Sequence, residues 1–242
     1  MKKYVLIILL GVIFTVISCL DDDGYSLNDM WVGFGMVEQV NSDPMDYRIH
    51  MDNGDVLMPV ASGYQLPWYY QGTNDPNSRL KTGDRILINY TVLADITGDD
   101  GNIDLYQVKV NSVKKILLKG ILDITEENRD SIGSDPVIVR DCWQTDGLLN
   151  FEIKYWGRYE VHYINLVKEP GDLTGENQPV ELELRHNANG DLEDIPYSAF
   201  VSFRLEEIQV AGLDSVRFRV TSTDYDGKEF EYEGVYRYHE NN

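Results

Sequence analysis

From Trp31 onward, the chain is built from short runs in which apolar and polar side chains alternate, with turn residues between the runs. The run from Arg85 to Leu93 is one of the clearest. A period of two puts every second side chain on the same face of a strand, so this pattern predicts β-strands that are buried on one side. Only Thr125 to Ser131 has a composition that favours helix, for one or two exposed turns. The sequence therefore predicts an all-β protein.

The first half of the chain contains five such runs, which are Trp31–Val40, Tyr47–Met51, Val56–Val60, Arg85–Leu93 and Ile103–Val113. Asn53-Gly54 suits a two-residue type I′ turn, in which both central residues need a positive φ, and it predicts a hairpin between the second and third runs. Asp99-Asp100-Gly101 supplies the turn between the last two runs. Five strands with one long insertion, from Ala61 to Lys81, predict a closed OB-type barrel over residues 30–120.

The second half contains seven candidate strands, which are Val137–Trp143, Leu149–Tyr155, Tyr159–Val167, Val180–Arg185, Phe200–Ile208, Val216–Ser222 and Glu229–Tyr236. Seven strands predict an antiparallel β-sandwich over residues 136–242. The stretch 121–135 is more polar and ends in Gly133-Ser134-Asp135-Pro136, so we expect a linker with a short helix there. Asn187-Ala188-Asn189-Gly190 and Asp226-Gly227 are predicted to close hairpins.

The start of the chain has the pattern of a lipoprotein signal. Lys2 and Lys3 precede an apolar run that ends at Ile17, and Ser18-Cys19 follows directly. The run is shorter than the ~18 to 20 residues that a spanning helix needs, but it suits the core of a signal peptide. We therefore predict a signal peptide at 1–18 and lipidation of the Cys19 thiol, so that acyl chains hold the mature protein in the outer membrane of a Gram-negative cell. The alternative is an ordinary secretory leader in which Cys19 is incidental.

An acidic run follows the predicted lipid site, within a tether at residues 19–29. Asp21, Asp22 and Asp23 stand directly behind Leu20. One interpretation is a solvated spacer, which a charge run of low hydrophobicity favours. The other is an export signal that takes the protein to the cell surface, because acidic residues behind the acylated cysteine have this role in some Gram-negative bacteria.

The formal net charge of −20 at pH 7 argues against one class of partner. Binding to nucleic acid depends on clustered Lys and Arg, and after residue 3 only Lys114-Lys115 forms such a cluster. We therefore expect no nucleic-acid partner. Cys142 has no intramolecular disulfide partner once Cys19 carries a lipid, and a chain of this length can fold without disulfides.

Motifs for catalysis or metal binding are sparse. The histidines, at 50, 162, 186 and 239, stand singly, and His162 reads as a structural histidine within a strand. The acidic cluster around Gly101 does not have EF-hand spacing, so a hairpin turn explains it better than calcium does. Cys142 beside Trp143 reads as a small buried hydrophobe. We therefore predict no catalytic residue, no metal site and no cofactor.

Four passages carry a resemblance to a known family. They are Tyr47–Asp55, Gly83–Tyr90, His162–Val167 and Glu181–Asn187. With them the chain resembles the NigD-like lipoproteins, in which an acylated leader precedes an OB-fold domain and a C-terminal β-sandwich. The resemblance implies this fold and brings no catalytic residues. The family is named after a bacteriocin gene cluster, which suggests an immunity role.

The insertion from Ala61 to Lys81 is the predicted ligand-binding segment. It contains Tyr64, Trp68, Tyr69 and Tyr70, whose flat rings suit sugar rings or a protein surface. The alternative is that these rings fold back and seal the barrel end or the seam between the two domains. We expect a lipid-anchored envelope protein that binds a glycan or a surface protein without catalysis. The alternatives are a bacteriocin immunity-type protein and a glycan-directed hydrolase, and the hydrolase would need two close carboxylates in a cleft.

The lipid anchor can be tested at Cys19. Serine lacks the thiol that accepts the lipid, so the Cys19→Ser variant should stay unprocessed or mislocalised. Metabolic labelling with a fatty-acid probe measures this directly. Label on the serine variant, or none on the natural chain, would show that the lipoprotein assignment is wrong.

The acidic run can be tested by neutralising Asp21, Asp22 and Asp23 together. If the run is an export signal, the triple Asn variant should move from the cell surface to the inner leaflet of the outer membrane and keep its fold. Proteinase treatment of intact cells, followed by blotting, reports the exposed fraction. Unchanged protease sensitivity would leave the run as a spacer.

Overall fold

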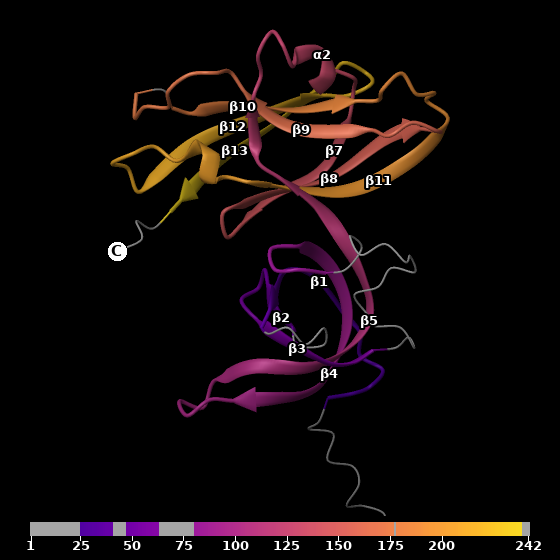
Figure 1. Cartoon of the computed structure of the whole chain (residues 1–242), viewed down its shortest axis with the longest axis vertical. Helices are drawn as coiled ribbons and strands as arrows, with labels where there is room; N and C mark the ends of the chain where they lie inside the picture. Colours follow the sequence, from indigo (N-terminus) through magenta and orange to yellow (C-terminus); the bar gives the residue numbers. More distant parts are fainter. Residues whose placement is uncertain (1–24, 41–46, 63–79, 177, 239–242) are drawn as a thin grey trace, which may run out of the picture.

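Strand β5 belongs to both domains of the protein. In the computed structural model, which describes residues 25–40, 47–62, 80–176 and 178–238, β5 runs from Ile103 to Lys119. Its first part pairs with β3 (Val56–Ser62) and β4 (Arg85–Thr97) in the lower domain of Figure 1. Its last residues, from Leu117, pair in parallel with β11 (Ile195–Arg204) of the upper domain. One strand therefore connects the two cores.

The lower domain is the five-stranded barrel that the sequence predicts. With β1 (Trp31–Gln39) and β2 (Tyr47–Met51), the neighbours run β1-β2-β3-β5-β4 and back to β1, and a parallel β3–β5 pairing closes the barrel. This is OB-type connectivity. The alternating apolar residues point inward and are fully buried, among them Ile49, Leu57, Ile86, Ile88 and Val108.

The β2–β3 hairpin is present, but its turn differs from the predicted type I′. Gly54 has a φ of 92° and Asn53 does not have a positive φ. The amide of Gly54 donates to the Met51 carbonyl at 2.9 Å, and the Met51 amide donates to the Asp55 carbonyl at 2.8 Å. This is a three-residue loop in which glycine alone takes the left-handed conformation. The hairpins at Asp99-Asp100-Gly101 and Asp226-Gly227 close with the same pattern of bonds.

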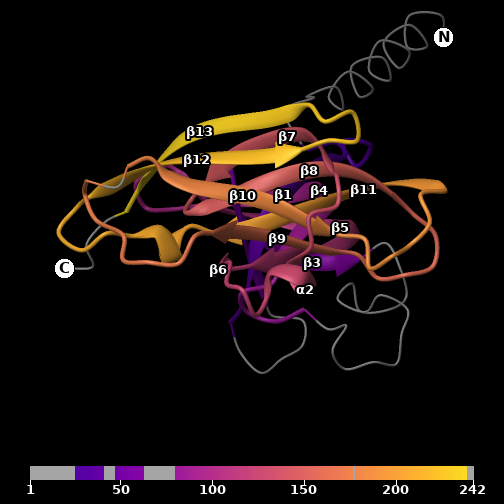
Figure 2. The same cartoon turned by 90° about the horizontal axis from the view of Figure 1, so that it is seen from above.

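The upper domain is a β-sandwich, as predicted. Besides β11 it contains β6 (Ile121–Asp123), β7 (Ile138–Thr145), β8 (Leu148–Gly157), β9 (Tyr163–Lys168), β10 (Val180–Asn187), β12 (Ser215–Thr223) and β13 (Glu229–Arg237). One sheet continues from the end of β5 as β11-β8-β7, and the other has the order β13-β12-β10-β9-β6. Figure 2 looks down on the second sheet, with the barrel strands behind it. Phe151, Phe203, Leu166 and Phe218 are buried between the sheets.

Several features of the sandwich differ from the prediction. β10 pairs with β12 in parallel, and β6 pairs with β9 in parallel, which alternation within a strand cannot reveal. The hairpin expected at Asn187–Gly190 is wrong, because β10 and β11 lie in different sheets. β9 begins at Tyr163, and residues 206–208 form a short 3-10 helix.

The expected linker, residues 121–135, contributes to the sandwich. Ile121–Asp123 form β6, and the expected short helix is α2 (Arg129–Ile132). Ile124 and Ile132 pack against Val167 of β9. No helix among the described residues is long and apolar enough to cross a membrane.

A buried arginine joins the two domains. The side chain of Arg85, at the start of β4, has no exposed surface and forms a bidentate pair with Asp52 from the β2–β3 loop. The same guanidinium donates to Asn150 Oδ1 of β8 at 3.1 Å. Asn150 also accepts from Ser202 of β11 at 2.6 Å. A ring cluster lies beside this network, with the Phe34 centroid 5.4 Å from that of Trp143 and 5.0 Å from that of Phe200.

Removing Asp52 tests this junction. Asp52→Ala leaves the Arg85 guanidinium buried without its counter-charge, and we expect a loss of about 3 kcal/mol in the free energy of unfolding. This is the lower end of the cost of breaking a buried ion pair, because the Asp52 side chain is 21% exposed. Urea unfolding followed by tryptophan fluorescence measures it. Glu181→Ala removes a surface partner of Arg219 and is the control, with an expected loss below about 1 kcal/mol. Equal losses in the two variants would contradict the role given to Arg85.

Candidate functional site

The site residues predicted from the sequence all lie outside the described residues. The lipid site and acidic run, Cys19, Asp21, Asp22 and Asp23, precede residue 25, and the aromatic candidates, Tyr64, Trp68, Tyr69 and Tyr70, fall between residues 62 and 80. The structure does describe the point where the chain returns to the barrel. Leu80 is buried in the barrel core, and its carbonyl accepts the Tyr47 hydroxyl at 3.0 Å.

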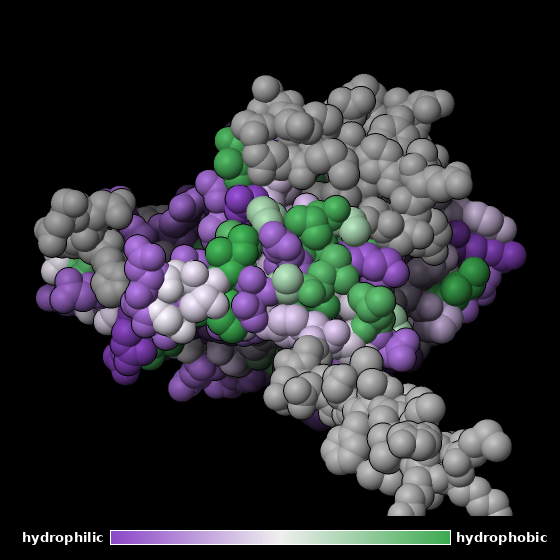
Figure 3. All heavy atoms as spheres, turned by 90° about the horizontal axis from the view of Figure 1, so that it is seen from below, coloured by the Kyte–Doolittle hydropathy of each residue, from purple (hydrophilic) through white to green (hydrophobic). Residues whose placement is uncertain are grey.

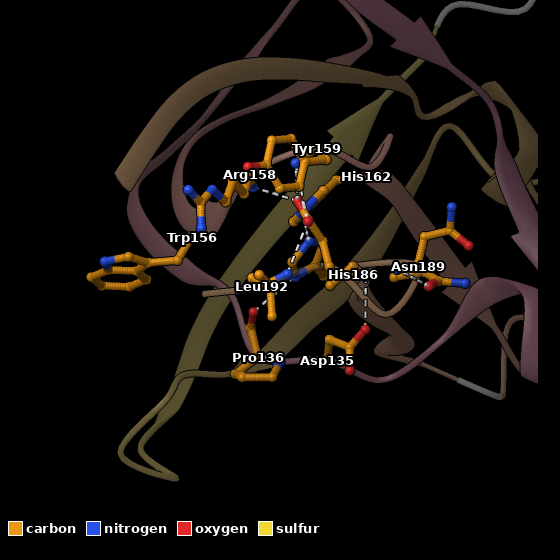
Figure 4. Close-up of polar contacts among 12 residues, drawn as sticks. Asp135, Pro136, Trp156, Arg158, Tyr159, His162, His186, Asn189 and Leu192 are labelled. Carbon is orange, nitrogen blue, oxygen red and sulfur yellow. Dashed lines mark hydrogen bonds and ion pairs between the residues drawn. The ribbon is translucent and has the colours of Figure 1, made fainter. Parts of the chain in front are cut away.

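The described structure brings titratable side chains together at one end of the sandwich (Figure 4). His162 lies just before β9, His186 lies in β10, and Asp191 follows β10. His162 Nδ1 is 2.8 Å from His186 Nε2, and His162 Nε2 is 3.2 Å from Asp191 Oδ2. The two rings stack with centroids 5.0 Å apart. His162 is therefore not inside a strand as expected, and two of the histidines that stand singly in the sequence form a pair.

The hydrogen-bond partners of the two rings indicate which nitrogens of His186 and His162 carry protons. His186 Nδ1 is 2.8 Å from the carbonyl oxygen of Pro136, which can only accept, so His186 carries its proton on Nδ1. Burial lowers the pKa of His186, which favours its neutral form. Its Nε2 is then an acceptor, and His162 Nδ1 must donate. The other ring nitrogen of His162, Nε2, faces Asp191 Oδ2.

Asp191 is an ionised carboxylate. Burial by itself would raise the pKa of Asp191, but four donors outweigh it and hold that pKa far below its usual range. They are the backbone N–H groups of Arg158, Tyr159 and Leu192 and the ring of His162. The Asp191 carboxylate therefore joins the backbone at Arg158 and Tyr159 to the His162 ring.

The contact between His162 and Asp191 holds the loops that form the end of the sandwich. Asp191 fixes the backbone at Arg158 and Tyr159, and His162 lies so close to Gly157 that a Cβ there would be 2.6 Å from Nε2. The Tyr155 ring lies 4.7 Å from the His162 ring and stacks on Tyr197 at 5.8 Å. A shallow hollow of about 370 Å³ lies between the rings of Tyr155 and Tyr197 and the loop at residues 157–162.

Large apolar side chains on the segments that line this hollow, or next to them in the chain, are exposed. We name them the sandwich-end surface, and they are Tyr159 (74% exposed), Val161 (64%), Tyr163 (46%), Leu192 (54%), Ile195 (47%) and Tyr197 (40%). Exposed acids, Glu160, Glu193 and Asp194, stand between them in the chain, and Asp194 pairs with Arg158 at 2.7 Å. An apolar patch with a polar rim is typical of a binding surface.

Cys142 and the acidic residues around Gly101 have surroundings that suit structural roles. Cys142 packs against the sandwich core, and burial raises the pKa of its thiol, which makes it unreactive. Asp100 accepts from the backbone and side-chain nitrogens of Asn102 at 3.0 and 2.8 Å, as a hairpin turn requires. Among the described residues, no group of three or more His, Cys, Asp or Glu side chains could hold a metal ion.

Solved structures from Bacteroides and Parabacteroides are similar to this chain. A crystal structure from Parabacteroides distasonis, named "Putative TOXIN related protein", is 30% identical, with 86% of this chain and 94% of that chain covered and a TM-score of 0.65. A NigD-like immunity protein from Bacteroides caccae is 19% identical, with 88% and 98% covered and a TM-score of 0.61. A "Putative lipoprotein" from Bacteroides fragilis is 11% identical, with 88% and 100% covered and a TM-score of 0.57. No curated protein matches the chain.

A family model also matches the upper domain. Residues 120–234 match the NigD-like C-terminal beta sandwich domain, which begins where β5 ends and includes β6. The barrel with OB-type connectivity precedes this sandwich, as the resemblance implies. The chain therefore belongs to the NigD-like family.

Proposed function

We propose that this protein is a lipid-anchored protein of the cell envelope that binds a ligand at the sandwich-end surface without catalysis. The observation that carries the proposal is a set of exposed apolar side chains beside loops that the buried contact between His162 and Asp191 holds in place. Fixed loops lose little conformational freedom when a ligand binds, which favours affinity. The location in the envelope rests on the lipoprotein signal that ends at Cys19.

The burial of the charged groups supports binding over catalysis. The side chains of His162 and Asp191 are 5% and 2% exposed. Every nitrogen of the histidine pair faces a partner within the protein, and Asp191 already accepts four donors. A catalytic base must instead reach a proton of the substrate. We infer that His162, His186 and Asp191 support the shape of the sandwich-end surface.

The rings of the surface suit a glycan as ligand. Tyr155 and Tyr197 stack with an angle of 26° between their planes, which gives a flat aromatic step beside the hollow. Flat rings contact the C–H faces of sugars, and the neighbouring acids and Arg158 can exchange hydrogen bonds with hydroxyl groups. A protein toxin is the second candidate ligand, favoured by the 30% identical relative that is named as toxin related.

Affinity electrophoresis tests the glycan. We expect residues 20–242 to be retarded in gels that contain starch, xylan or mannan, and Tyr159→Ala to weaken the retardation about tenfold, as the loss of a central aromatic contact does. Trp31→Ala removes an exposed ring from the barrel and is the matched control, with unchanged retardation.

The other outcomes each exclude part of the proposal. Release of reducing ends from the polysaccharide would identify a hydrolase and contradict binding without catalysis. Equal weakening in Tyr159→Ala and Trp31→Ala would move the ligand away from the sandwich-end surface. No retardation in any gel would reject these glycans, and protection of cells against a toxin encoded beside this gene would then support immunity.

A further inference from the structure

The segment before β1 is attached to the lower end of the barrel. The Tyr25 hydroxyl donates to Asp95 of β4 at 2.6 Å, and its ring meets Tyr106 of β5 edge to face at 6.4 Å. The Asp29 amide donates to the Ser26 carbonyl at 3.0 Å, which closes a turn. The described chain therefore begins at the foot of the barrel, away from the sandwich (indigo in Figure 1).

Large apolar side chains on this foot are exposed. We name as the barrel foot Leu27 (72% exposed), Met30 (67%), Trp31 (57%) and Val32 (64%), together with Ile96 (40%) and Ile103 (44%) near the β4–β5 turn. Figure 3 looks at the molecule from below and shows apolar side chains gathered among polar ones on this face. The barrel core does not use these side chains, and Met30, Trp31 and Val32 are consecutive in the chain, which is unusual for a solvated surface.

The length of chain before Tyr25 limits where this face can lie. Tyr25 is the sixth residue after Cys19. An extended chain spans at most ~3.6 Å per residue, so the attached end of the barrel lies within about 20 Å of a lipid on Cys19. A tether this short gives the foot a high effective concentration at the membrane, so even weak contacts are populated.

We propose that the barrel foot rests on the surface of the bilayer and fixes how the protein stands on the membrane. This rests on the lipid anchor in the proposed function and goes beyond it. Trp favours the headgroup level of a membrane, and aliphatic neighbours can enter the boundary of the acyl chains. Asp29 and Asp95 lie beside the foot, so the face suits zwitterionic headgroups and disfavours anionic ones. The sandwich then points away from the bilayer.

Depth-dependent fluorescence tests this orientation. In a Cys142→Ala background, Met30→Cys on the foot and Leu192→Cys on the sandwich-end surface each receive an environment-sensitive fluorophore, because both positions carry exposed aliphatic side chains. The lipidated protein is placed in phosphatidylcholine vesicles with lipids that carry a quencher. We expect a blue shift and loss of emission at position 30, and neither change at position 192.

The controls separate the anchor from the orientation. Flotation of the vesicles shows first whether the protein is membrane bound, and its failure would refute the anchor and with it this proposal. Binding without a blue shift or quenching at position 30 would overturn the orientation and leave the anchor intact. Equal quenching at both positions would show a protein that lies flat, which also contradicts it. A second label at Val32→Cys checks that the result does not depend on one substitution.

Discussion

The arrangement of the two domains depends on the partners of one buried charge. A guanidinium without exposed surface has to be paired and hydrogen bonded, because leaving it unpartnered inside a protein costs several kcal/mol. Arg85 finds its carboxylate in its own domain, at Asp52, and an amide oxygen in the other, at Asn150. The observed docking of the two domains brings Asn150 to the guanidinium, and this contact favours that orientation.

Residues of the β2–β3 loop and of β1 position the partners of Arg85. The three-residue loop after β2 presents Asp52, whose amide donates to the Phe34 carbonyl at 3.0 Å. Gly33 and Gly35 flank Phe34, and a Cβ on either would come within 2.8 Å of the side chain of Met51 or Ile49. Glycine on one side of β1 thus lets Met51 fill the barrel, while Phe34 on the other side packs under Arg85, 5.3 Å from the guanidinium. Barrel packing and domain docking share the same few residues.

The sequence predicts what depends on local pattern. Alternation and turn residues identify the β-class, the barrel and the sandwich, because the side-chain period of a strand is a local property. The His162–His186 pair was not predicted, because strand order places residues 24 positions apart side by side. Arg85 reads as the polar start of a strand, and burial appears only once the sandwich covers it. The apolar residues 159, 161 and 163 were predicted as strand, but β9 starts at Tyr163 and leaves Tyr159 and Val161 in an exposed loop.

β5 sets the distance between the two surfaces that we propose to be functional. A strand of 17 residues at ~3.3 Å per residue measures at most about 56 Å, and bulges against β4 shorten and bend it. It begins beside the barrel foot and ends inside the sheet that carries Tyr197. Arg85 contacts both domains beside this strand, so we infer that a tether that orients the barrel also orients the sandwich. If the barrel foot rests on the bilayer, as we propose, the sandwich-end surface is held above the membrane, where an external ligand can reach it.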